Sequence, residues 1–252
     1  MLRTLALLLA VGVALPLSAS FDSGLTALAQ DKQDKKPKKA PPEPKVWMCK
    51  KGELIWEEKF DGAALSKDWH KGLGDWAVES GVLKGAEVPA DKHHAYASRQ
   101  IPSINVVIQF SFKLDGAKWL GGFFDGKEHV SALSINADSF NIKRMSGIGP
   151  TSKSTEIDSS KMKLNDGAWH TVVWEIFGDE MIATIDDQQV VLAKAEGLSS
   201  DRNHLELNTA GGTSALFKVV KVWKGEADDK WPQKRATLLQ LTKKKPAAVG
   251  YK

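Results

Sequence analysis

The chain is poor in cysteine, with Cys49 as the one thiol among 252 residues. A single thiol forms no internal disulfide, although exported proteins often carry such crosslinks. The fold must therefore be held together by its core. Cys49 is interpreted as an ordinary residue at the edge of the domain, with an intermolecular disulfide as the alternative.

Long apolar runs are also scarce, and the one run, from Leu5 to Leu17, follows the positive charge of Arg3. It is too short to span a bilayer, which indicates a secretory signal peptide over residues 1–29. Residues 27–29 provide an A-x-A cleavage site, residues 18–20 an earlier one, and an uncleaved anchor is the alternative. No later stretch could cross a membrane, so we expect a secreted or periplasmic protein without a transmembrane segment after cleavage.

The net charge of +4 is concentrated in the ends of the chain, because residues 1–45 and 243–252 are rich in lysine. The body, residues 46–242, is mildly acidic, which argues against specific binding of nucleic acid. Basic ends suit nonspecific contact with anionic polymers, or are simply solvated and disordered.

Composition divides the remaining chain into three parts. Residues 30–45 contain mostly lysine and proline and predict a disordered linker. Residues 46–232 contain the apolar patterns of one domain. Residues 233–252 predict a short helix or coil followed by a basic tail.

Sustained helical periodicity is absent from the body, and period-two alternation replaces it. Residues 166–191 predict a long β-hairpin with apolar residues on both faces, as at the centre of a sandwich. Residues 105–114 alternate most regularly and predict one buried and one largely wet face. Residues 147–163 are polar and predict a loop. About ten to twelve short strands between Gly, Asp and Asn turns indicate an all-β fold, an antiparallel sandwich or barrel.

Three motifs in this order resemble the concanavalin A-like jelly rolls of the laminin G and glucanase type. The resemblance is strongest to the 3-keto-disaccharide hydrolase, or family 16 glycoside-hydrolase-like, domains. It covers most of residues 54–224 and implies two curved sheets and a role in carbohydrate binding or breakdown. The motifs are Trp76-x-Val78-x-x-Gly81-Val82-Leu83, Trp169-His170-x-Val172 with Gly178 and Ile185-Asp186-Asp187, and Phe217-Lys218-x-Val220-Lys221-Val222-Trp223.

Candidate catalytic carboxyl groups are few. Retaining glycosidases need two carboxyl groups about 5 Å apart, and family 16 enzymes place them as Glu-x-Asp-x-x-Glu. Glu156 and Asp158 fit the first two positions, but Lys161 occupies the third. The sequence also shows no phosphate-binding glycine loop, no G-x-S-x-G motif and no zinc spacing.

The densest polar cluster is Asp91-Lys92-His93-His94, in which Asp91 and His93 are candidates for proton transfer. Adjacent histidines on an extended chain point to opposite faces, so no shared metal ion is predicted and an exposed loop is the alternative. Asp186 and Asp187 could bind calcium or simply form a turn. We therefore predict no cofactor, and calcium is not indicated.

Sugar binding needs an exposed aromatic plate beside polar side chains. Most of the nine tryptophans lie in strand patterns and are expected in the core. Trp119, Trp69 and Tyr96 are the candidate plates, and His94 lies near Tyr96 in the chain.

Three functional hypotheses remain open. The first is a glycan-binding or cell-surface interaction module, expected to be monomeric, with a glycan or cell-surface polysaccharide as its partner. The second is an enzyme, a glycoside hydrolase acting on a disaccharide or 3-keto sugar. The third is a structural envelope protein without a small ligand.

Overall fold

Residues 43–241 are the part of the chain that the computed structural model describes. The predicted signal peptide, most of the predicted linker and residues 242–252 of the predicted tail lie outside the described residues. Between residues 43 and 241, no helix is both long and apolar enough to cross a membrane.

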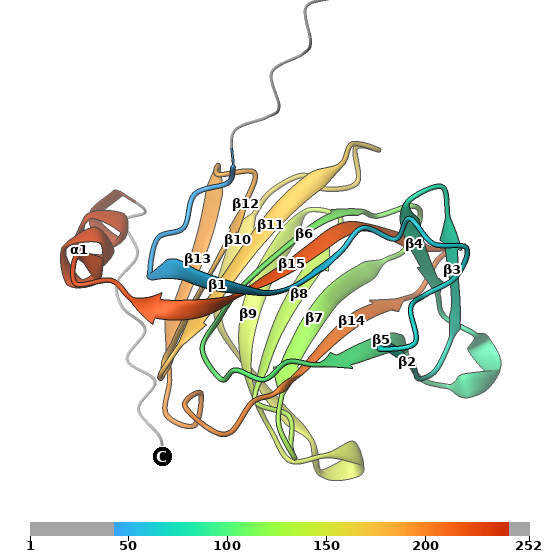
Figure 1. Ribbon diagram of the computed structural model, residues 1–252, viewed down its shortest axis with the longest axis horizontal. Coiled ribbons are helices and arrows are strands. Elements are labelled where there is room, and N and C mark those ends of the chain that lie inside the picture. The colour runs from blue at the N-terminus through green and yellow to red at the C-terminus, as the bar shows by residue number, and fades with distance from the viewer. Residues whose placement is uncertain (1–42, 242–252) are drawn as a thin grey trace, which may run out of the picture. The chain divides into compact units, whose positions relative to one another are not determined.

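The larger of two β-sheets contains eight strands, all paired antiparallel (Figure 1). Its long strand β15 also pairs with β1. The path across the sheet is β13 (Gln189–Lys194), β12 (Glu180–Ile185), β11 (His170–Phe177), β6 (Val106–Lys113), β15 (Ala215–Ala227), β4 (Val82–Ala86) and β3 (Asp75–Glu79), with β1 (Cys49–Glu58) beside β15.

The second sheet contains seven antiparallel strands and packs against the first. Its order is β10 (Lys153–Lys161), β9 (Ser139–Ser146), β8 (Ser131–Asn136), β7 (Trp119–Asp125), β14 (His204–Ala210), β5 (Ala95–Gln100) and β2 (His70–Lys71). The predicted antiparallel sandwich is thereby confirmed, and the predicted hairpin over residues 166–191 is β11, β12 and the start of β13.

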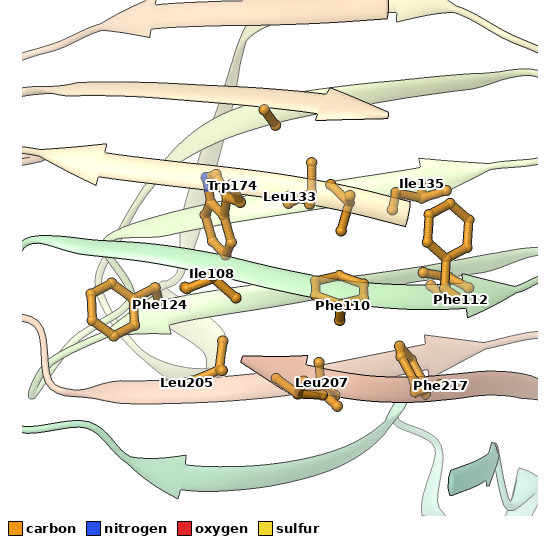
Figure 2. Packing of buried hydrophobic residues seen from close by; sticks show 14 of the residues in the cluster. Ile108, Phe110, Phe112, Phe124, Leu133, Ile135, Trp174, Leu205, Leu207 and Phe217 are labelled. Atoms are coloured by element: carbon orange, nitrogen blue, oxygen red, sulfur yellow. The ribbon is translucent and has the colours of Figure 1, made fainter. Parts of the chain in front are cut away.

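The core fills the space between the inner faces of the two sheets (Figure 2). Strand β6 contributes Ile108, Phe110 and Phe112, and β14 contributes Leu205 and Leu207 from the opposite sheet, all without exposed surface. Alternate residues of a strand point to the same face, so each strand that faces this core presents its other residues outward.

The outer face of the eight-stranded sheet carries a second apolar cluster. Val107, Val173 and Ile182 pack there against the residues at the start of β1 and against α1 (Trp231–Leu241). This covering explains why β11 carries the apolar side chains of Val173 and Phe177 on its outer face. The outer face of β6, expected to be largely wet, is accordingly buried at Val107.

The predicted loop over residues 147–163 is wrong, because most of it forms the edge strand β10. Its polar side chains gave no apolar alternation, yet its backbone pairs with β9 along its whole length, with a bulge between Glu156 and Asp158. The Asp158 carboxylate also accepts the backbone N–H of Leu192 in β13, at 2.8 Å. Backbone pairing with β9 and the hydrogen bond to β13 therefore stabilise β10, in place of hydrophobic contact.

A buried carboxylate fastens the start of β1 to the outer face of the large sheet. Glu175 of β11, 1% exposed, accepts the backbone N–H groups of Trp47, Met48 and Cys49, each at 2.7 Å. Burial raises the pKa of Glu175 to about 7. The three N–H donors favour the charged form and so partly oppose this rise. Glu175 therefore connects the N-terminal segment to the sandwich.

Replacing Glu175 by alanine should destabilise the fold by about 3 kcal/mol, because buried N–H groups would lose their acceptor. Glu175→Gln should lose less stability than Glu175→Ala, since the amide oxygen still accepts hydrogen bonds from the backbone. Urea denaturation measures both, with the exposed Glu53→Ala as a control that should stay within about 0.5 kcal/mol of the native protein. Equal stability of the Glu175→Ala variant and the native protein would contradict this role.

Candidate functional site

A hollow of about 740 Å³ opens on the outer face of the seven-stranded sheet. Its floor is formed by β2, β5, β14 and β7, and its rims are the loop around His93 and the segment 148–152 that follows β9. These two loops project at the right and at the bottom of Figure 1. Glu206 lies centrally, because in the strand register it is opposite Ser98 on one side and Phe123 on the other.

Five of the six histidines of the chain line this hollow. His70 lies on β2, and His93 and His94 lie in the loop before β5. His129 lies in the loop after β7, and His204 lies on β14. The sixth, His170, is buried elsewhere between Asp186 and Asp166, at 2.7 and 3.1 Å. Such concentration of one residue type from four segments marks the hollow as the candidate functional site.

Aromatic rings form much of the wall. The His94 ring meets Trp119, Phe123 and Tyr96 edge-on, with ring centroids 5.5, 5.8 and 6.4 Å apart. Phe123 also has an edge-on contact with His129, at 5.4 Å. Burial lowers the pKa of His94 to about 4, so its ring is neutral at neutral pH. The wall is therefore largely aromatic and weakly polar.

His129 is held in place by Asp125. The His129 Nδ1 atom lies 2.7 Å from Asp125 Oδ2, and Asp125 Oδ1 accepts the backbone N–H groups of Val130 and Ser131, at 2.7 and 3.3 Å. Both oxygens of the buried Asp125 carboxylate are thus occupied. The hydrogen bond to Asp125 raises the pKa of His129 above its ordinary value.

Glu206 is the one carboxyl group among the described residues that line the hollow. Its side chain is 13% exposed. Within residues 43–241, Glu206 Oε1 forms an ion-pair contact with His204 Nδ1, at 3.8 Å. Burial, helped by the nearby Asp125, raises the pKa of Glu206 to about 7. The floor therefore holds a carboxyl group that exchanges a proton near neutral pH.

Further polar atoms beside Glu206 lack partners. Ser98 and Asn208 are fully buried, and the Ser98 Oγ and Asn208 Nδ2 atoms have no hydrogen-bond partner in the described part of the chain, while the Asn208 side chain interacts with the His94 ring. Buried polar atoms in proteins are nearly always hydrogen-bonded. Ser98 lines the hollow, and Asn208 follows Glu206 by two residues on the same face of β14. These atoms provide hydrogen-bonding capacity for a bound molecule.

The structure brings some of the sequence-predicted residues together here. His93, His94 and Tyr96 line the hollow, and Trp119 reaches it through its contact with His94. The two adjacent histidines were expected to point to opposite faces, but their ring centroids are 4.0 Å apart. The reason is that the chain bends at His93, after a left-handed residue at Lys92, instead of running extended.

Other predicted residues lie elsewhere. Trp69, expected as an exposed plate, is 6% exposed and packs edge-on against Trp56. Asp91 accepts the backbone N–H of Gly74, at 2.9 Å. Glu156 and Asp158 lie on β10, at the opposite edge of the sheet from β2.

The sequence contains a pattern that indicates some of the site residues that were not predicted, on β14. His204, Glu206 and Asn208 alternate with the buried Leu205 and Leu207, so three polar side chains share one face of β14. Asp125, His129 and Phe123 offer no comparable pattern. Their place in the site depends on the register between β7 and β14, segments some eighty residues apart.

Within residues 43–241, no group of three or more His, Cys, Asp and Glu side chains is arranged to hold an ion. Asp186, considered for calcium, has both oxygens engaged, by the His170 ring and by the backbone N–H of Thr171.

Comparison with known proteins identifies the fold. The protein-family model of the laminin G domain matches residues 120–224 of the sequence. Among solved structures, the CBM2 module of the evolved Dit of Lactobacillus casei BL23 phage J-1 is 11% identical, with a TM-score of 0.54 over 73% of this chain and 99% of that one. SCLam, a family GH16 endo-beta-1,3(4)-glucanase, is 13% identical, with a TM-score of 0.53 over 72% and 98%. LamAcat from Zobellia galactanivorans is 12% identical, with a TM-score of 0.51 over 68% and 97%.

No curated protein matches the chain. At these identities the structural likeness shows a shared fold. The chain is thus a concanavalin A-like jelly roll, as the sequence resemblance predicts.

The two shifted histidines should be visible in an NMR titration. His94 should titrate near pH 4, and His129 above its ordinary 6.5. In Asp125→Asn the pKa of His129 should fall, because the carboxylate that favours the imidazolium is gone. Since the folded pKa of His129 is raised, its stabilising effect is complete below about pH 6.5 and disappears as the pH rises through the folded value. Circular dichroism would check that the variant is folded, and an unchanged His129 titration would refute the assignment.

Proposed function

We propose that this domain is a glycan-binding module whose ligand occupies the histidine-lined hollow. The observation that carries the proposal is a concave site with aromatic walls and an unsatisfied polar floor on the outer face of a jelly-roll sheet. The solved structures with a similar fold include a CBM2 module and a glucanase, which supports carbohydrate as the ligand class.

The chemistry of the hollow suits a sugar ring. A pyranose has apolar C–H faces and a rim of hydroxyl groups, so it needs a flat apolar surface and hydrogen-bonding groups in one place. Phe123 and Tyr96 provide the surface, and Ser98 and Glu206 provide donors and acceptors. A volume of about 740 Å³ lies within the range of ligand pockets.

Export supports this proposal, since extracellular glycans would be accessible to a secreted or periplasmic protein. The evidence for export is the N-terminal sequence, so this location stays a prediction, and so does the monomeric state. The cellular location and the oligomeric state do not change the chemistry of the hollow.

A glycoside hydrolase is the second candidate, favoured by the pKa of about 7 that burial gives Glu206. A carboxyl group that is protonated at neutral pH can donate a proton to a leaving group. The carboxylate nearest to it in the strand register, Asp125, is 3% exposed and does not line the hollow, so it is not placed to act as a nucleophile on a ligand there. Binding therefore has the stronger support.

Binding should depend on the aromatic wall. Tyr96→Ala and Phe123→Ala should each weaken glycan affinity about tenfold, because a buried aromatic contact contributes about 1.4 kcal/mol. A glycan array on the full chain would identify ligands, and calorimetry would measure the variants. Trp169→Ala, which removes an exposed tryptophan that lies under Lys218 and does not line the hollow, is the matched control and should bind normally.

Product release from the same glycans would decide the second candidate. If the domain is a hydrolase, Glu206→Gln should abolish turnover and leave binding measurable. Binding without turnover in the native protein would exclude hydrolysis of those glycans. Absence of both binding and turnover across a broad panel would contradict the proposed function and favour a structural envelope role.

A further inference from the structure

We propose that the glycan bound in the hollow carries a free, protonated amino group, and that Glu206 is the residue that selects it. This inference rests on the proposed function and adds the chemical class of the ligand. An amino sugar that is not N-acetylated is the simplest molecule of this class.

The hollow lacks the lysine and arginine side chains that would favour an acidic sugar. The chain contains 35 lysines and arginines, yet none is among the described residues that line the hollow. Anionic sugars and phosphates are normally bound by such side chains. Glu206 therefore faces the ligand without a strong cationic partner from the protein.

The charges that face Glu206 do not balance it at neutral pH. From β7, Asp125 is paired with His129, so the two largely cancel when the imidazole is protonated. Burial lowers the pKa of both His94, in the loop before β5, and His204, on β14, which keeps their rings neutral. The remaining neighbours that titrate are His70 on β2, His93 in the loop, and Tyr96 on β5.

The acceptors on the floor match the donors of an ammonium group. An ammonium has three N–H donors and no acceptor. Glu206 lies between Ser98, directly opposite on β5, and Asn208, two residues further along β14. The Glu206 carboxylate and the Ser98 hydroxyl are two acceptors that line the hollow side by side, and the hydroxyl has no partner among the described residues.

The wall also favours a cation. The rings of Tyr96 and Phe123 present π-electron density, which attracts an ammonium group, and the attraction is stronger in a desolvated site. A hydrogen bond between ionised partners is roughly twice as strong as one between neutral groups. A neutral hydroxyl or acetamide would leave Glu206 protonated and would forgo this gain.

The test is an NMR titration of the full chain at pH 7 with three matched probes. They are the methyl glycosides of glucosamine and galactosamine, the same compounds after N-acetylation, and the parent glucosides and galactosides. We expect the free amino forms to bind about tenfold more tightly than both other forms. Glu206→Gln should lose this preference but keep binding the neutral forms, whereas Glu53→Gln, on an exposed position of β1, should behave like the native protein.

Calorimetry gives an independent readout. Pairing with an ammonium should drive the proton from Glu206, so binding should release protons, detected by comparing two buffers of different ionisation enthalpy. Glu206→Gln should show no such release. Equal or weaker binding of the amino forms would overturn this inference and leave the proposed function intact, whereas failure of all probes and of the glycan array would overturn the proposed function itself.

Discussion

The period of two along a β-strand is the constraint on which this site depends. On β14, Leu205 and Leu207 point into the sandwich and have no exposed surface. The residues between and around them must then point outward, which places His204 and Glu206 on the floor of the hollow. Packing of the inner face therefore fixes the orientation of the binding side chains, and a shift by one residue would bury them in the core.

Two buried carboxyl groups show how the same chemistry serves different purposes on the two sheets. Burial raises the pKa of both Glu175 and Glu206 to about 7. Three backbone N–H groups surround Glu175 at 2.7 Å, so its role is fulfilled within the protein. Glu206 has no comparable donors among the described residues, although leaving a buried carboxyl group without partners is costly. That difference separates the structural carboxylate from the one that we propose contacts a ligand.

Local sequence patterns predict much of this fold but little of its site. Alternating strands such as residues 105–114 could be recognised because packing against a core leaves an apolar period. The polar strand β10 could not, because its stability comes from backbone pairing and from the bond between Asp158 and Leu192. His93, His94 and Tyr96 were found because they are close in sequence. Glu206 and His129 were not, since strand register brings them together.

The distribution of charge within the fold matters more for recognition than the charge of the whole chain. A net charge of +4 suggests affinity for anions, but the lysines responsible lie largely at the ends of the sequence. The hollow instead combines five histidines, aromatic rings and one carboxyl group. A ligand meets this local environment at a distance of a few ångströms, where water is excluded and electrostatic interactions are strong.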